Sequence, residues 1–144
     1  MPYTTDTEIE IELEEELTTT YIISSQHRAT GNPNKTVWTI DFEDEVECFT
    51  QTKTSEWIES NYGWGLKVID SVLQYIGHNF ENELLKIAKF VDGSTNDIWH
   101  GYPADYLRRS QDRPPTFVLK SWVDQGYLTK AKMNKIRRGQ SCNL

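Results

Sequence analysis

Residues 97–115 hold the side chains of this sequence that are best suited to acid–base chemistry. His100 carries an imidazole, which titrates near neutral pH. The Tyr102 phenol follows two residues later and the Asp105 carboxylate three residues after that. An imidazole beside a phenol and a carboxylate can transfer protons as a general acid or base. His100, Tyr102 and Asp105 are therefore the candidate catalytic residues.

The same stretch also fits a purely structural role. Gly101 frees the backbone, Pro103 can start a short helix over "ADYLRR", and Trp99 can fill the edge of a core. No nucleophile motif, phosphate-binding loop or second carboxylate motif accompanies the histidine. The sequence therefore favours an aromatic joint at residues 94–115 over an active site.

The sequence contains no motif for binding a metal or a cofactor. The three histidines, His27, His78 and His100, have no histidine, cysteine or carboxylate partner at the spacing that a metal site needs. Cys48 lies in an acidic run, which raises the pKa of a thiol and weakens it as a nucleophile. We expect no cofactor, no metal and a structural cysteine.

Charge is distributed unevenly along the chain. Residues 1–100 contain 6 lysines and arginines against 19 acidic residues, a net charge of −13. Residues 101–144 contain 9 against 3, a net charge of +6. An acidic surface repels nucleic acids and membranes and attracts basic proteins. The two ends are expected to face different partners or each other.

The acidic part suggests a stoichiometric inhibitor of a basic protein, such as a toxin or nuclease. This would be an interaction protein of the immunity, antitoxin or anti-defence type, in which electrostatic attraction speeds capture of the partner. The alternative is that the charges only confer solubility. The predicted partner-binding residues are acidic or carry a large ring: Glu12, Glu14, Glu15, Glu16, Glu43, Asp44, Glu45, Glu47, Trp57 and Trp64.

The basic end supports a second hypothesis, a regulatory domain that contacts DNA or RNA. Cationic side chains interleaved with aromatic rings suit phosphate contacts and base stacking. The predicted contacts are Arg108, Arg109, Arg113, Lys132, Lys135, Arg137 and Arg138. A helix-turn-helix alignment on Gly126 fits poorly, because Trp122 falls where a small residue is needed. Alternatively, these cations face solvent or pair with the acidic half of the same chain.

The secondary structure that positions the candidate residues is expected to start with β-strands at the N-terminus. Isoleucine and glutamate alternate over residues 8–17, and the β-branched run at 18–25 favours a strand. A turn is expected at 26–35, before a second alternating run at 36–49. The sequence predicts an N-terminal antiparallel hairpin or three-stranded meander, with Cys48 on a strand.

Helices are expected to cover this sheet. Apolar residues recur every three or four positions from Ile69 to Val91, which predicts one long amphipathic helix ending at Gly93. Alternatively, Gly77 and Asn79 divide it into two helices, with Asn79 as the cap of the second. A shorter helix is expected over residues 54–63. The predicted fold class is therefore α+β.

The C-terminal third carries clear helix boundaries. A helix preceded by Pro115 and stopped by Gly126 is expected first. Thr129 is the predicted N-cap of a second, basic helix that ends at Gly139. A pair of short helices is therefore predicted here.

The organisation expected for residues 1–144 is a single domain. It would consist of an acidic α+β body at 1–93, the aromatic joint at 94–115 and a basic helical tail at 116–144. The first residues carry no apolar segment of a secretory signal, and no run reaches the length of a membrane span. With only two cysteines, a cytoplasmic protein with no membrane partner is expected.

Overall fold

The computed structural model describes residues 3–28 and 34–144 as mixed α+β structure with three α-helices. The strands are β1 (Glu8–Glu12), β2 (Thr18–Ile22), β3 (Val37–Trp38), β4 (Ile58–Glu59), β5 (Tyr62–Leu66), β6 (Val68–Ile69), β7 (Val72–Leu73), β8 (Gly77–His78), β9 (Leu84–Leu85), β10 (Ile87–Val91) and β11 (Ile98–Pro103). The helices are α1 (Phe42–Thr54), α2 (Thr116–Asp124) and α3 (Lys130–Arg137). Part of the predicted turn at 26–35, residues 29–33, lies outside the described residues.

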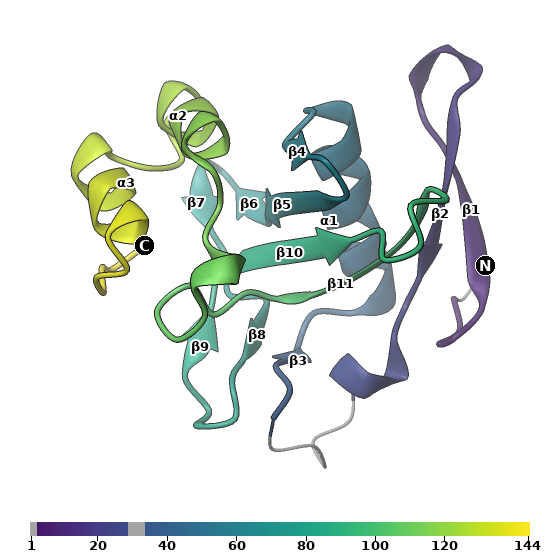
Figure 1. Ribbon diagram of the computed structural model, residues 1–144, viewed down its shortest axis with the longest axis horizontal. Coiled ribbons are helices and arrows are strands. Elements are labelled where there is room, and N and C mark those ends of the chain that lie inside the picture. Colours follow the sequence, from purple (N-terminus) through teal and green to yellow (C-terminus); the bar gives the residue numbers. More distant parts are fainter. Residues whose placement is uncertain (1–2, 29–33) are drawn as a thin grey trace.

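A six-stranded sheet in the order β1-β2-β11-β10-β5-β4 forms the centre of the described chain. Its neighbours are antiparallel except β11 and β2, which run parallel with Ile98 opposite Thr20. Smaller sheets, β3-β8-β9 and β6-β7, lie beside it. Helix α1 lies behind the large sheet in Figure 1, while α2 and α3 lie at one end.

Alternation along β10 separates two faces of the sheet. Ala88 and Phe90 face α1 and pack in a buried cluster, in which the rings of Phe49 and Phe90 lie 5.4 Å apart. Gly65 on β5 allows the helix to approach closely, since a Cβ there would lie 2.2 Å from Oγ1 of Thr52. One face of the sheet is therefore sealed by α1.

The C-terminal helices cover only one end of the opposite face. Trp122 of α2 packs edge-on against Trp57 at 5.8 Å, within a buried cluster that includes Leu66 and Ile87. The helix boundaries agree with the sequence prediction: Gly126 and Gly139 adopt positive φ angles of 81° and 67°, and the Thr129 hydroxyl accepts from the Lys132 amide at 3.2 Å. The pair of short helices is confirmed.

No α-helix covers the remainder of that face, although the short 3-10 helix at Ser110–Asp112 lies against Lys89 and Tyr102 (Figure 1). We call this remainder the open sheet face. It is formed by Thr20, Ile22, Tyr62, Lys89, Val91, Ile98, His100 and Tyr102. Most of these side chains are half-buried, and Tyr62 is 41 % exposed. The sheet therefore presents apolar and aromatic groups to solvent.

The long helix predicted for residues 69–91 is wrong, because this segment forms short strands from β6 to β10. Left-handed backbone at Asp70, Ser71 and Asn82 turns the chain between strands. Ile69 and Leu84, which belong to the predicted apolar stripe, are 50 % and 56 % exposed. The helical spacing therefore arose from apolar residues of separate hairpins.

The strand predicted over 36–49 is also wrong beyond Trp38. The Asp41 carboxylate accepts from the Asp44 amide at 2.9 Å and caps α1. Acidic residues in the first turn stabilise the positive end of a helix, so the run that resembled a charged strand edge suits a helix start. Cys48 consequently lies on α1, buried against Leu66.

The predicted N-terminal arrangement is corrected in two further places. The chain turns at Glu14–Glu16, so that β1 pairs with β2 rather than with residues 36–49. The short helix predicted over 54–63 is replaced by a turn with β4 and the start of β5. The α+β class is confirmed, but the cover of the sheet is α1 and not the predicted long helix.

Candidate functional site

The structure separates Asp105 from the other two candidate catalytic residues. Strand β11 places His100 and Tyr102 on the open sheet face. Asp105 is 4 % exposed and accepts hydrogen bonds from the Asn79 amide at 3.1 Å and from Arg108 at 3.4 Å. The Tyr102 hydroxyl donates instead to Oδ1 of Asp112 at 2.9 Å. Tyr102 is therefore paired with Asp112, which was not among the candidate residues.

Asp112 is the centre of a buried polar network that sequence reasoning missed. It is fully buried, and its Oδ2 accepts the backbone amide of Asp105 at 3.0 Å. Nζ of Lys89 lies 3.7 Å from Oδ1 and donates to the Gln111 carbonyl. Burial lowers the pKa of Lys89, and the nearby Asp112 acts in the opposite direction. The network fastens residues 105–113 to the sheet.

A cleft opens beside this network, between the open sheet face and residues 110–115. Its volume is about 580 Å³. Tyr62 and Trp64 line it, and Nζ of Lys89 lies 4.9 Å and 5.9 Å from their ring centroids. Arg113 lines it from the opposite segment, and Glu59 is its acidic residue. We call this the Tyr62 cleft.

Two histidines lie near Tyr102. The His27 ring stacks on the Tyr102 ring at 5.1 Å, and its Nδ1 donates to the Thr36 carbonyl at 2.9 Å. The His100 imidazole forms no hydrogen bond within the described part of the chain. Burial is the main cause that lowers the pKa of both imidazoles, and Lys35 lowers them further. Burial therefore disfavours the protonated form of both imidazoles.

These lowered pKa values predict a loss of stability in mild acid. Below the ordinary pKa of 6.5, the unfolded chain takes up protons that the folded chain resists. The histidines' contribution is complete above pH 6.5 and is lost as the pH falls through the folded pKa values. Urea unfolding of the wild type and of His27→Gln/His100→Gln, measured at a series of pH values, should show a steeper fall for the wild type. Parallel curves would contradict this assignment.

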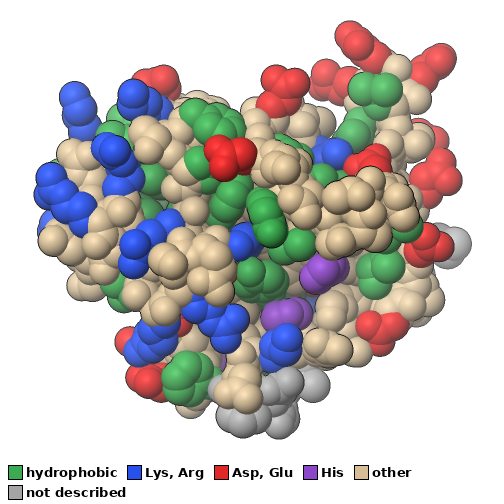
Figure 2. Space-filling view, viewed as in Figure 1, with side chains coloured by type: hydrophobic (Ala, Val, Ile, Leu, Met, Phe, Trp, Pro, Cys, Tyr) green, Lys and Arg blue, Asp and Glu red, His purple; other side chains and the backbone are tan. Residues whose placement is uncertain are grey.

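Most glutamates of the predicted acidic surface gather on the β1–β2 hairpin. Glu8, Glu10 and Glu12 are exposed along β1, and Glu14–Glu16 form the exposed turn. None of them forms an ion pair with another described residue. The hairpin projects beyond the rest of the sheet in Figure 1, and acidic side chains collect over it in Figure 2. Leu17, beside these glutamates, is 62 % exposed.

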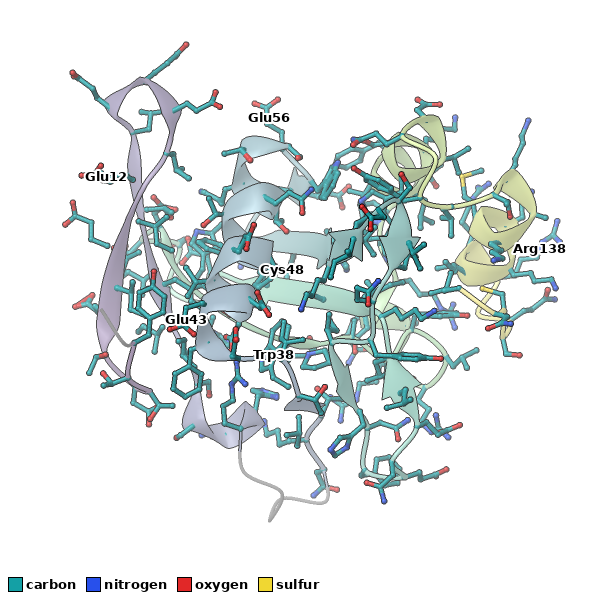
Figure 3. The ribbon with its side chains drawn as sticks, turned by 180° about the vertical axis from the view of Figure 1, so that it is seen from behind. Glu12, Trp38, Glu43, Cys48, Glu56 and Arg138 are labelled. Atoms are coloured by element: carbon teal, nitrogen blue, oxygen red, sulfur yellow. The ribbon has the colours of Figure 1, made fainter. Side chains whose placement is uncertain are left out.

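The second predicted acidic group lies on α1 and is partly neutralised. Glu45 is fully buried and accepts from Arg28 at 2.7 Å and from the Tyr21 hydroxyl at 2.5 Å. Asp44 pairs with Lys67 at 2.9 Å. Glu43 and Glu47 are exposed, but α1 covers the other face of the sheet (Figure 3). The structure therefore does not bring the two acidic groups together.

The predicted aromatic anchors lie inside the molecule. Trp57 is 2 % exposed and its indole donates to Oγ of Ser121 at 3.0 Å. Trp64 is 4 % exposed and donates to the Asp112 carbonyl at 3.2 Å. Both rings belong to the core cluster under α2, so neither is offered to a partner.

The predicted cations fall into two groups. Arg108 pairs with Glu81, Glu83 and Asp105, while Arg109 and Arg113 donate to the carbonyls of Asn34 and Tyr106. The α3 cations form no ion pair within residues 3–28 and 34–144: Lys132, Lys135, Arg137 and Arg138. Figure 2 shows lysine and arginine side chains collecting at the end opposite the hairpin. The basic tail is not neutralised by the acidic hairpin.

Comparisons with known proteins leave the site to be interpreted from its geometry. No family model, curated protein or solved structure matches the chain. Among the described residues, no three or more histidine, cysteine, aspartate or glutamate side chains are grouped as a metal site would require. Nor does this part of the chain contain a helix of the length and apolarity needed to cross a membrane.

Proposed function

We propose that this protein binds a basic surface of another protein through the β1–β2 hairpin and acts as its stoichiometric inhibitor. The observation that carries the proposal is the exposure of the hairpin glutamates without ion-pair partners in the described chain. Unpaired charges of one sign on a projecting element attract an opposite charge and speed the encounter. Inhibitors of the immunity, antitoxin or anti-defence type belong to this class.

Apolar groups beside the hairpin support a protein partner over a small cation. Leu17 is exposed next to the glutamate turn, and a hollow of about 300 Å³ is lined by Glu12, Leu13, Glu16, Leu17 and Thr18. Ile22 and Ile98 are half-buried on the adjoining open sheet face. Protein interfaces combine such apolar contacts with a polar rim. Leu17 therefore takes the anchoring role that the sequence suggested for Trp57 and Trp64.

Two variants with equal charge test the proposal. The hairpin variant changes Glu12, Glu14 and Glu16 to glutamine. The control changes Glu43, Glu47 and Glu56 to glutamine, and these three residues are exposed on α1 or just after it. Figure 3 shows Glu12 on the hairpin, and Glu43 and Glu56 near the two ends of α1. Tagged wild type captures partners from the native host, and each purified partner's association rate is measured at low and high salt. The hairpin variant should associate about tenfold more slowly at low salt, while the control stays near wild type.

Three results would count against this proposal. A captured partner with an acidic surface contradicts the electrostatic basis. Equal slowing by both variants means that net charge acts without a site on the hairpin. If no host protein binds and the variants only become less soluble, the glutamates confer solubility alone.

A further inference from the structure

The Tyr62 cleft lies near the β5–β4 edge of the large sheet, whereas the acidic hairpin forms the opposite edge, and the cleft is independent of the proposed inhibition. We propose that it binds a nucleotide, with the base stacked on the Tyr62 ring and the phosphate held by Arg113. The proposal stands on three features of the cleft, which are an exposed ring, an unbalanced cation and polar groups along one wall. Its volume of about 580 Å³ falls within the range of small-ligand sites.

The exposed ring is that of Tyr62. It is 41 % exposed, while Trp64 and Lys89 next to it are buried. The Trp64 ring lies 6.5 Å away, and Nζ of Lys89 lies over the Tyr62 ring at 4.9 Å. Lys89 thus lies over one face of the ring, and the exposed part of the Tyr62 side chain is the surface on which a base would stack. An aromatic face on an uncovered sheet is a common platform for a nucleobase.

The cleft favours an anion over a cation. The charge of Lys89 is balanced by Asp112 at 3.7 Å. Arg113 donates to the Tyr106 carbonyl and forms no ion pair with a carboxylate of the described residues. A guanidinium is well suited to a phosphate, and the acidic Glu59 belongs to the opposite, β4 side of the cleft.

Residues 110–113 form one wall of the cleft and supply polar groups that can hydrogen-bond to the edge of a nucleobase. Ser110 and Gln111 are exposed, line the cleft, and form no side-chain hydrogen bond in the described chain. A hydroxyl and an amide supply donors and acceptors for the ring nitrogens and carbonyls of a base. The ligand class is therefore a planar heterocycle that carries a phosphate.

Such a nucleotide has two sources, a free mononucleotide or one nucleotide of a single strand. The end of α3 lies against Arg113, since a Cβ atom added to Gly139 would lie 2.1 Å from Nη2 of Arg113. Arg137 and Arg138 precede that glycine and are exposed. A single strand would continue from the cleft onto these cations, whereas a free nucleotide would not need them.

The test measures the affinity of the full chain for adenosine and uridine monophosphates and for single-stranded adenine and thymine oligonucleotides of about ten residues. Tyr62→Ala should weaken binding about tenfold. Tyr75→Ala is the matched control, because Tyr75 is 51 % exposed and lies outside the cleft. The hairpin variant with Glu12, Glu14 and Glu16 changed to glutamine should bind nucleotides at least as well as wild type, so the two proposals fail separately.

The outcomes divide as follows. Mononucleotide binding that Tyr62→Ala weakens supports a free nucleotide. Oligonucleotide binding that both Tyr62→Ala and Arg137→Ala/Arg138→Ala weaken supports a single strand. If only the arginine variant weakens binding, the contact is on α3 and the cleft proposal is overturned. It is equally overturned if neither class of probe binds.

Discussion

Asp112→Ala is expected to lower the free energy of unfolding by about 3–5 kcal/mol, as removal of one partner from a buried ion pair does. The substitution leaves the Lys89 ammonium, whose side chain is 5 % exposed, without its carboxylate. It also removes the acceptor for the Tyr102 hydroxyl and the Asp105 amide. Residues 105–113 would then lose their attachment to the sheet. Urea denaturation monitored by tryptophan fluorescence measures the effect.

Three further variants separate the causes of this loss. Asp112→Asn keeps an oxygen acceptor and should lose less than the alanine variant. Asp124→Ala removes an exposed carboxylate and should stay within about 0.5 kcal/mol of wild type. Adding Lys89→Met to Asp112→Ala should recover stability, because no buried charge remains unpaired. A loss below about 1 kcal/mol in Asp112→Ala would show that the network does not hold the loop.

The C-terminal helices could be predicted because their boundaries are encoded locally. Thr129 caps α3, and Gly126 and Gly139 supply the left-handed conformation at which each helix ends. Each of these signals depends only on residues within one turn of the chain. Nothing distant had to be known to place α2 and α3.

Residues 69–91 could not be assigned from apolar spacing alone. Turns separate short strands here, and residues of different hairpins happened to follow a helical period. Asp70–Ser71 and Asn79–Asn82 were the available signals, since aspartate, serine and asparagine favour turns. Asn79 in fact closes its turn by accepting the Glu81 and Glu83 amides on its side chain.

The positions of the candidate binding residues could be predicted from the sequence only where a run of charged residues indicates surface exposure. The glutamates of Glu8–Glu16 fall on the exposed hairpin, as an acidic run with few basic neighbours indicates. Lys89 and Asp112 are 23 positions apart in sequence and meet only because β10 and the 110–112 turn are adjacent in the fold. No local sequence pattern therefore predicts that these two side chains pair.

Glu45 shows how one wrong element changes the interpretation of a residue. On a strand, its carboxylate would belong to a row of exposed acidic groups. On α1, one helical turn beyond Asp41, it points inward and meets Tyr21 of β2 and Arg28. A residue expected at a partner surface is thus a buried link between the helix and the sheet.

Glu45→Ala is therefore expected to destabilise the fold by about 3–5 kcal/mol, comparable to Asp112→Ala. The Tyr21 hydroxyl, on a fully buried ring, loses its acceptor, and Arg28 loses its carboxylate. Since Arg28 also donates to the Ile40 carbonyl, the start of α1 would loosen together with it. Thermal unfolding followed by circular dichroism would show a lower midpoint.

Glu47→Ala supplies the matched control, because Glu47 lies on the same helix, is exposed and should change stability by no more than about 0.5 kcal/mol. Glu45→Gln keeps an oxygen for Tyr21 and should fall between the two alanine variants. The same proteins then enter the partner-association measurement at a temperature where all remain folded. An association rate of Glu45→Gln equal to that of wild type would agree with a buried structural glutamate. Slowing equal to that of the hairpin variant would instead show that Glu45 belongs to the binding surface.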